Sequence, residues 1–559
     1  MSNIFFEITI IICLVSVFTI ILKLLRQPAI LAYILTGIII GPFGQLQLQN
    51  LDAIKTMGEF GITLLLFMMG LELNFKELKS IGKSVFIIGI NQIILTGLAA
   101  YFISSIFNFP VLTSFYISIA LTLSSTIIVV KLLSDKRELT SLYGKISIGL
   151  LLVQDFLAIL VLIFLSGFNS ENQSLNLSQL NLFSLFIKGV ILFAVVALLS
   201  EKVFPKLIHL IAKSQEALFL VSIAWVFGLA AVVSSPTVGF SIEIGGFLAG
   251  LSLANAMENF QIASKVRALR DFFITIFFVS LGMQMQLGSL EKIMLPVIVF
   301  SLFVLILKPL IITSAMGFLG YRKRTSFLTG IHAGQISEFS LIIIFLGNKL
   351  GQIPTEISSL ITAVGVITFV FSTYAISNAN RLFKILSPCL WFFERKQTKR
   401  ENIGSTEEDL GKLKDHVVLI GANRIGESIL DAIDGLKDKV VVVDFDPQIV
   451  EKLKNKKVLT IFGDISDTDI QERLRLDKAK MIISTAPDTE DNLFLINCIK
   501  SLNKTAKIIV VSYDSDDAKY LYKAGADYVV LPHLAGGRHI AKILEENNLE
   551  EMKNLKPKD

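Results

Sequence analysis

Long apolar runs separated by short polar connections fill the first 390 residues of the chain. The runs lie at about 4–25, 28–44, 54–73, 84–107, 111–133, 144–168, 182–200, 215–235, 238–256, 271–288, 293–319, 326–350 and 355–380. Most are close to the length of about 20 apolar residues that carries a helix across a bilayer. The pattern therefore predicts a polytopic α-helical membrane domain over residues 1–390, with about thirteen spans.

Basic residues mark alternate connections between these runs. They cluster near 23–26, 76–83, 131–145, 202–213, 265–270 and 322–324, and again from Arg381 onward, whereas the intervening connections are nearly free of Lys and Arg. Connections rich in Lys and Arg stay in the cytoplasm, so we expect the N-terminus outside and the C-terminus inside. The first run has no basic residue before it and is closed by Lys23 and Arg26, which favours a spanning helix over a cleaved signal peptide.

Two of the runs are interrupted by polar residues in their middle. The fifth carries Ser-Ser-Thr at 124–126, and the twelfth carries the stretch 330–340, with His332, Gln335 and Glu338. Interrupted spans at corresponding places in two halves of a chain are typical of transporters built from inverted repeats, with the binding site at the midplane. Alternatively, the hydroxyl groups bond to their own helix backbone and the spans are continuous.

Two charged residues lie deep inside apolar runs. Asp155 is near the middle of the sixth, and Lys308 precedes Pro309 in the eleventh. A charge at mid-membrane costs roughly 2.5–3.5 kcal/mol on insertion scales and usually marks an ion or proton pathway. We expect Asp155 to bind a proton and a monovalent cation alternately, unless it pairs with a Lys or Arg for packing alone. Lys308 is expected to pair with a carboxylate, to cap a broken helix, or to extend to the interface.

The remainder of the chain alternates strand and helix patterns. Residues 391–414 read as a polar linker, and 415–559 as a cytoplasmic α/β Rossmann-like domain. Its first strand leads into Gly-Ala-Asn-Arg-Ile-Gly at 421–426, where Asn423 replaces the middle glycine of a dinucleotide fingerprint. The expected nucleotide contacts are Gly421, Asn423, Arg424, Ile425, Gly426, Asp444, Asp446 and Asp464.

Asp444 ends the second strand about 20 residues after the glycine loop, where a ribose-binding acid is expected; Asp446 is the other choice for that role. The bulk of Asn423 leaves dinucleotide binding open, and a mononucleotide remains the alternative, so AMP, ATP and NAD(H) are all considered as regulators. The domain could also be purely structural and dimerising. Nothing in it supplies a substrate domain, so hydride transfer and a membrane-bound oxidoreductase are not expected, and neither is another enzymatic activity.

Composition agrees with this division. The chain is 53% hydrophobic and 18% charged, with a net charge of +5. The basic residues sit between membrane spans, so they orient the protein and do not form a nucleic-acid footprint. Cys13, Cys389 and Cys498 are far apart and lack metal-ligand spacing. We therefore expect no disulfide, no zinc site and no metal cofactor.

Four segments together resemble the monovalent cation:proton antiporter-2 family, and within it the Kef-type potassium:proton antiporters. They are Leu-Val-Gln-Asp-Phe-Leu-Ala-Ile at 152–159, Leu-Ser-Ser-Thr-Ile-Ile-Val at 123–129, Phe-Phe-Val-Ser-Leu-Gly-Met at 277–283 and Gly-Gln-Ile-Ser-Glu-Phe-Ser at 334–340. The C-terminal domain resembles the TrkA-N, or regulator of potassium conductance, module. The resemblance implies a homodimer in a bacterial-type inner membrane, whose dimerisation bundle supports an ion-carrying core with two crossing broken helices and elevator-like motion. It also allows for an ancillary cytoplasmic subunit.

The resemblance implies that Asp155 is the shared cation and proton carrier and that Gln154 helps to ligate the ion. Oxygen ligands from these two residues and from the Ser125 or Thr126 hydroxyl suit potassium or sodium without choosing between them. Ser124, Gln335, Glu338 and Lys308 are expected to support the site. A single carrier carboxylate suggests one-for-one, electroneutral exchange.

Two features test the resemblance further. Glutathione-gated Kef proteins carry an acidic loop between spans, whereas the corresponding stretch 259–271 is basic here, so glutathione gating is not expected. A potassium channel-like protein with the same cytosolic module is the main alternative, with a sodium:proton antiporter of the same fold as another. A channel should show a selectivity filter such as Thr-Val-Gly-Tyr-Gly, and the sequence has none.

Overall fold

The computed structural model divides the chain into two compact units, one of residues 1–136 and 143–393 and one that includes 394–559. It describes residues 4–41, 50–72, 83–136, 138–139, 141–166, 214–235, 238–256, 258–286, 290–319, 321, 323–388, 390, 413–433, 439–444, 447–456, 458–462, 465, 468–486 and 489–545, with isolated positions between 189 and 211. Each unit is treated by itself.

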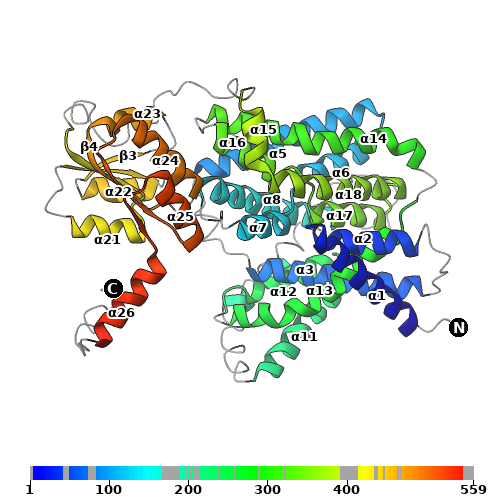
Figure 1. Cartoon of the computed structure of the whole chain (residues 1–559). Coiled ribbons are helices and arrows are strands. Elements are labelled where there is room, and N and C mark those ends of the chain that lie inside the picture. The colour runs from blue at the N-terminus through cyan, green and yellow to red at the C-terminus, as the bar shows by residue number, and fades with distance from the viewer. Residues whose placement is uncertain are drawn as a thin grey trace. The chain divides into compact units, whose positions relative to one another are not determined.

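The first unit contains one bundle built from the earliest helices and from those in the middle of the chain, here called the scaffold bundle. Its members are α1 (Ile4–Leu24), α2 (Ala29–Ile40), α3 (Leu51–Glu72), α11 (Gln215–Val233), α12 (Ile242–Leu253) and α13 (Asn259–Met283). α3 packs against α12 and α13, and α2 packs against α1 and α13 (Figure 1). A Cβ on Gly61 would lie 2.6 Å from the Phe273 carbonyl oxygen. Glycine therefore allows α3 and α13 to meet backbone to backbone.

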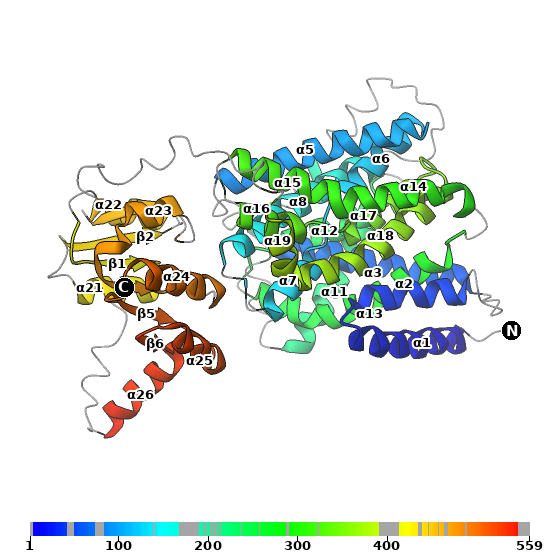
Figure 2. The ribbon, with the colours of Figure 1, turned by 45° about the horizontal axis from the view of Figure 1, so that its top comes forward.

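The remaining membrane helices form a second group, here called the core bundle. They are α5 (Lys83–Ile106), α6 (Val111–Thr122), α7 (Thr126–Asp135), α8 (Leu142–Ser166), α14 (Leu290–Leu302), α15 (Lys308–Phe318), α16 (Lys323–His332), α17 (Glu338–Lys349) and α18 (Thr355–Ser377). A π-helical turn, η2 (Phe303–Leu307), joins α14 to α15. α17 packs between α6 and α18, and α15 against α5 and α16 (Figure 2). A short amphipathic helix, α19 (Ala379–Leu386), follows α18 and contacts α16.

The described helices agree with the hydropathy pattern except at the start of the tenth run. Eight helical stretches are long and apolar enough to cross a membrane when α6 is counted with α7 and α14 with α15, and α2 and α12 are shorter apolar helices. The seventh run, 182–200, lies largely outside the described residues, so the count of about thirteen spans stays a prediction. The tenth span was expected from 271, but its helix α13 begins at Asn259. The fifth and twelfth runs are each two half-helices, as the polar interruptions predicted.

The second unit is a doubly wound α/β domain, as predicted. Its strands are β1 (His416–Ile420), β2 (Val440–Asp444), β3 (Leu459–Phe462), β4 (Ala479–Ser484), β5 (Lys507–Val511) and β6 (Tyr528–Val530). They form a parallel sheet of order β3-β2-β1-β4-β5-β6. Strands are added in one direction from β1 to β3 and in the other from β4 to β6, so the strand order reverses between β1 and β4. Such a switch point is where ligands bind in open α/β sheets. The described helices of this unit are α21 (Arg424–Ala432), α22 (Pro447–Asn455), α23 (Thr468–Arg473), α24 (Thr489–Leu502), α25 (Ser515–Ala524), α26 (Pro532–Glu545) and the short 3₁₀ turn η5 (Leu476–Lys478).

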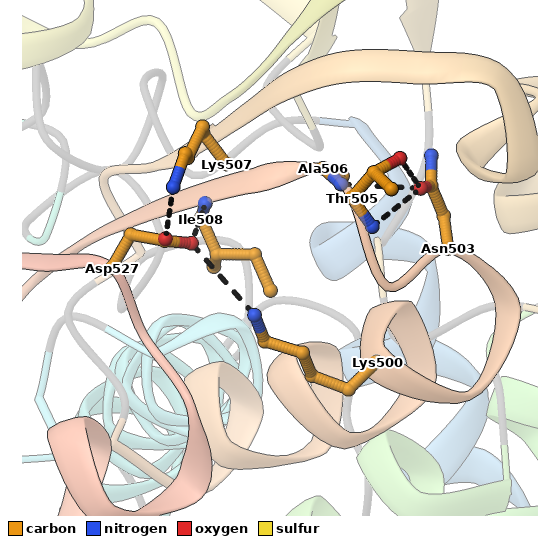
Figure 3. A network of polar contacts seen from close by, with 7 residues as sticks. All are labelled: Lys500, Asn503, Thr505, Ala506, Lys507, Ile508 and Asp527. Atoms are coloured by element: carbon orange, nitrogen blue, oxygen red, sulfur yellow. Dashed lines mark hydrogen bonds and ion pairs between the residues drawn. The ribbon is translucent and has the colours of Figure 1, made fainter.

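Hydrogen bonds fix the start of β5, which lies between β4 and β6 in this sheet (Figure 3). The Asn503 side-chain oxygen accepts from the backbone N–H groups of Thr505 and Ala506, which closes the turn after α24. Asp527 accepts from Lys507 at 2.9 Å and from the Ile508 N–H at 2.9 Å. These bonds lower the pKa of the Asp527 carboxyl, with Lys507 the larger cause.

Candidate functional site

The first chain break separates α6 from α7. α6 ends at Thr122, Leu123 is extended, and α7 begins at Thr126 after Ser125, which caps it by accepting from the Ile128 N–H at 3.3 Å. Hydroxyl side chains compete with the helix backbone for hydrogen bonds and are favoured at N-caps. The Ser-Ser-Thr sequence therefore gives the break its local reason, and the alternative of a continuous helix is wrong here.

The second break separates α16 from α17. α16 ends at His332, and α17 begins at Glu338, where Ser337 and Ser340 form a reciprocal capping pair. The Ser124 hydroxyl donates to the Ala333 carbonyl oxygen at 3.1 Å, so the two breaks lie against each other. The N-terminal ends of α7 and α17 thus meet inside the core bundle. Helix N-termini carry partial positive charge, which favours carboxylates beside them.

Asp155 and Gln154 are consecutive on α8 and serve different neighbours. The Thr126 hydroxyl donates to Asp155 Oδ2 at 2.8 Å, and the carboxylate is 6% exposed. Gln154 Oε1 accepts from the Ser124 N–H at 2.8 Å, while its Nε2 donates to Gln92 Oε1 at 2.7 Å. The arrangement brings Asp155 to the first turn of α7 and turns Gln154 toward the extended residues of the break.

Gln92 is a further member of this network that the sequence analysis did not select. Its Nε2 donates to the Thr122 carbonyl oxygen and to the Thr96 hydroxyl, both at 3.2 Å. Gln92 and Gln154 therefore satisfy a carbonyl and an N–H that the end of α6 leaves without helical partners. The polar pair Asn91-Gln92 within an otherwise apolar run was the signal that could have found it.

Lys308 joins the two breaks. Its ammonium group is fully buried and donates to the Leu123 carbonyl oxygen at 2.7 Å and to the Gln335 carbonyl oxygen at 3.0 Å. Of the three roles considered for Lys308, the structure shows the capping of broken helix ends. Lys308 is the first residue of α15 and follows the π turn η2 directly, so the winding of this turn sets the direction of the Lys308 side chain.

Glu338 begins α17 and lies beside the first break. Glu338 is 6% exposed, and its carboxylate lies close to the Ser125 hydroxyl and to the Asp155 carboxylate. Glu338 Oε2 and Gln335 Oε1 have no hydrogen-bond partner among the described residues, and both atoms are buried. Gln335 donates through its Nε2 to the His332 carbonyl oxygen at 3.1 Å.

These residues together form an oxygen-rich, largely dehydrated site. Two carboxylates, two hydroxyls and the ends of two half-helices meet there, and one buried ammonium group is bonded to carbonyl oxygens. Carboxylate, hydroxyl and carbonyl oxygens are the ligands of hard cations. A carboxylate in such a place binds either a cation or a proton. Among the residues that the structure describes, no group of three or more His, Cys, Asp and Glu side chains is placed to hold a metal ion.

The glycine loop of the second unit follows β1, as predicted. Gly421 has a φ of +79°, and a Cβ on Gly426 would overlap the Gly421 carbonyl oxygen. Asp444 Oδ2 accepts from the Ala422 N–H at 2.8 Å, so this carboxylate holds the loop. Asn423 and Ile425 lie at the start of α21, whose N-terminus is suited to an anion. Asp446, Asp464 and the Arg424 side chain lie outside the described residues.

Comparison with known proteins identifies both units. The model of the sodium/hydrogen exchanger family, transmembrane part, matches residues 10–378, and the TrkA-N domain model matches residues 417–532. The chain is 26% identical to the putative cation/proton antiporter YbaL of Escherichia coli, over 93% of each chain. It is 24% identical to the glutathione-regulated potassium-efflux system protein KefC of Escherichia coli, over 89% of this chain and 78% of KefC.

A solved antiporter has a similar fold. The sodium proton antiporter MjNhaP1 from Methanocaldococcus jannaschii superposes with a TM-score of 0.50 over 69% of this chain and 97% of MjNhaP1, at 19% identity. Together with the family models, this similarity confirms the predicted architecture: a membrane-spanning antiporter domain followed by a Rossmann-like TrkA-N domain. The resemblance to Kef-type antiporters is confirmed as well.

Proposed function

The chain belongs to the sodium/hydrogen exchanger family, and from this premise we propose that it exchanges potassium ions for protons across a bacterial inner membrane. The relative named as a potassium-efflux system protein, KefC, matches 89% of this chain, which supports potassium over sodium. The relative named as a cation/proton antiporter, YbaL, supports exchange for protons. Proteins of this family are transporters, which argues against an enzymatic activity. The observation that carries the proposal is the buried Asp155 beside two chain breaks that meet each other.

Asp155 is the carrier in this proposal. A proton and a partly dehydrated potassium ion compete for the same carboxylate, because burial favours its neutral form whenever no cation is bound. Competition for one group and access from alternate sides are sufficient for obligatory exchange. The Thr126 and Ser125 hydroxyls supply further oxygen atoms, and Glu338 adds negative charge to the site. Gln154 positions the break through Ser124, and we assign it this role in addition to any contact with the ion.

The core bundle carries the site, and we propose that it moves against the scaffold bundle in an elevator-like manner. The breaks, Asp155 and Lys308 all belong to the core, so they move together. The scaffold provides the homodimer contact. In this proposal the N-terminus lies outside and the TrkA-N domain lies in the cytoplasm, an orientation supported by the basic residues at alternate connections. A membrane domain ending near 390, a linker over 391–414 and a regulatory domain from 415 complete the proposal.

The TrkA-N domain regulates exchange by binding a nucleotide at its glycine loop. The support for this is the match to the TrkA-N model, the tight turn at Gly421 and the start of α21 directly after it. AMP, ATP and NAD(H) are the candidates. Asp444 accepts a hydrogen bond from the Ala422 N–H of the glycine loop. The ribose of a bound nucleotide would therefore contact the Asp444 carboxylate and this loop together.

Exchange in proteoliposomes tests the proposal. Purified full-length protein is reconstituted around a pH-sensitive dye and challenged with potassium and, separately, with sodium, with AMP, ATP or NADH added to the side of the TrkA-N domain. The expected result is a potassium-driven pH change without a membrane potential, at a rate that one nucleotide alters. A potassium diffusion potential without a pH change would contradict exchange and indicate a channel.

A further inference from the structure

A charged cluster connects the two bundles at some distance from the ion site. Lys349, in the last turn of α17, belongs to the core; Glu59 of α3 and Glu243 of α12 belong to the scaffold. The Lys349 ammonium lies 2.6 Å from Glu59 Oε1 and 3.8 Å from Glu243 Oε1. Glu243 is 2% exposed, and its Oε2 has no hydrogen-bond partner among the described residues. One cation thus serves two carboxylates, one of which is deeply buried.

The two glutamates are held by a rigid part of the scaffold. One turn along α3 from Glu59, the Thr63 hydroxyl donates to the Glu59 carbonyl oxygen at 2.8 Å. A Cβ on Gly246, one turn along α12 from Glu243, would lie 2.6 Å from the Thr63 carbonyl oxygen. Because the backbones of α3 and α12 touch beside both glutamates, the backbone positions of Glu59 and Glu243 cannot separate from each other without unpacking the scaffold.

Lys349 sits at the opposite end of the helix that starts at the ion site. α17 begins with Glu338, next to Ser125 and Asp155, and runs for 12 residues, a length of about 18 Å. A helix of this kind moves as one rigid element, so any displacement of the ion site relative to the scaffold also displaces Lys349 from the two glutamates. The cluster therefore reports on the position of the core.

The other contacts between the two bundles described near Lys349 are made by side chains. The Ser359 hydroxyl of α18 accepts from the Gln286 N–H at 3.0 Å, and the ring of Phe277 meets the ring of Phe345 edge to face. A small cavity lies between these contacts, lined by Leu281 and Gln284 on one side and by Asn348 and Ser358 on the other. Within each bundle, by contrast, glycines bring helix backbones into direct contact. Side-chain contacts of this kind can be made and broken during a transport cycle.

We propose that Lys349, Glu59 and Glu243 form an ion lock that holds the core against the scaffold in one state of the cycle and opens in the other. The inference rests on the proposed alternating access. Glu243 lies in the first turn of α12 and Lys349 in the last turn of α17, and both helix ends belong to the outer membrane face in the orientation proposed from the basic connections. Glu59 lies about two turns into α3. Breaking the lock leaves Glu243 buried without its cation, a cost that favours the locked state.

Accessibility of the interface tests the lock without reference to transport. Cys13, Cys389 and Cys498 are replaced by Ser, and Ser359→Cys is labelled with a membrane-impermeant maleimide in the full-length protein. Lys349→Gln should raise the labelling rate at least about fivefold, the lower end of typical conformational coupling, and the exchange Lys349→Glu with Glu59→Lys should lower it again. Lys384→Gln, which changes an exposed lysine of α19, is the matched control and should leave the rate unchanged. An unchanged rate in Lys349→Gln would overturn the lock.

A cross-link decides the matter if Lys349→Gln does not fold. Glu59→Cys and Lys349→Cys in the same background are joined by a short, thiol-cleavable reagent. Exchange should be lost on cross-linking and recover on reduction. Full exchange by the cross-linked protein would overturn the lock without bearing on the role of Asp155 as the carrier. Failure of the cysteine-free background protein to exchange ions before any cross-linking would instead count against the proposed function.

Discussion

The Lys308 ammonium donates to the Leu123 carbonyl oxygen at 2.7 Å, across 185 residues of chain. Its second bond, to the Gln335 carbonyl, makes this one side chain the bridge between two interrupted helices. The Lys308 ammonium thus bonds to backbone oxygens of the two breaks, and these two bonds leave the Asp155 carboxylate available for an ion. A site organised in this way keeps its shape when the carrier changes between its proton-bound and cation-bound forms.

Replacing Lys308 should damage the fold of the site before it affects ion specificity. In Lys308→Gln the shorter side chain cannot reach both carbonyls, and each unsatisfied buried group costs about 1–3 kcal/mol. We expect a lower unfolding temperature in detergent. We also expect the exchange rate to fall at least tenfold, which corresponds to an activation free energy raised by about 1.4 kcal/mol. Thermal unfolding followed by size-exclusion chromatography measures the first effect. Wild-type stability in Lys308→Gln would show that the two bonds contribute little.

Asp155→Asn should abolish exchange and leave the fold intact. Asparagine keeps the volume of the side chain and can still accept a hydrogen bond from Thr126, but it can neither take up a proton at physiological pH nor neutralise a cation. The measurement is the potassium-driven pH change in proteoliposomes, with Asp52→Asn, an exposed carboxylate of α3, as the control. Exchange at the wild-type rate in Asp155→Asn would exclude this carboxylate as the carrier.

Gln92 and Gln154 should act as one unit. Gln92→Leu and Gln154→Leu each remove the bond between the two amides and leave part of the α6 end unsatisfied, so each should lower stability by about 1–3 kcal/mol. The double variant should lose clearly less stability than the sum of the two single losses, because both single variants remove the same hydrogen bond between the amides. Thermal unfolding of the four proteins completes the cycle. Additive losses would mean that the amides stabilise the break independently.

Gly426→Ala should disable the glycine loop of the TrkA-N domain. The added methyl group would overlap the Gly421 carbonyl oxygen, so α21 must move away from the loop. We expect loss of the nucleotide effect on exchange, while basal exchange persists, together with destabilisation of about 1–3 kcal/mol as for other overpacked sites. Gly536→Ala in α26 is the control, since a Cβ there meets no atom within 4 Å. A full nucleotide response in Gly426→Ala would argue against binding at this loop.

The Asp527 network predicts a pH dependence of the TrkA-N domain. Because Lys507 and the Ile508 N–H lower the pKa of Asp527 in the folded domain, its stabilisation is present above the unfolded carboxyl pKa of about 3.9. It is lost as the pH falls through the folded pKa. Asp527→Asn should therefore be less stable than wild type at pH 7, by up to about 1.5 kcal/mol, and this difference should shrink as the pH falls below about 3.9. A difference independent of pH would mean that the carboxylate charge has no part in it.

Much of this architecture could be predicted because charge and polarity are rare in membrane helices. Asp155, Lys308 and the two interruptions stand out against apolar sequence, and the strands of the TrkA-N domain follow from their β-branched runs. The start of α13 at Asn259 could not be found by hydropathy, since Lys265, Arg267 and Arg270 place that end of the helix outside the apolar run. The partners of Gln154 and Lys308 could not be found either, because they belong to other segments of the chain: Gln92 lies on α5, and Gln335 lies in the break between α16 and α17.

The π turn at Phe303–Leu307 has a consequence for insertions and deletions in this region. A π turn holds one more residue than an α turn, and each residue of an α-helix advances it by about 100°. Deleting one residue within the π turn would restore regular winding and leave Lys308 facing the two carbonyls, because the π turn takes up the extra residue. An added residue that is wound as regular helix would instead turn Lys308 by roughly that angle away from them. The bridge between the breaks thus depends on the winding of this segment as well as on the lysine. An insertion in α14–α15 should be as harmful as loss of the side chain itself, whereas loss of the extra residue of the π turn should be tolerated.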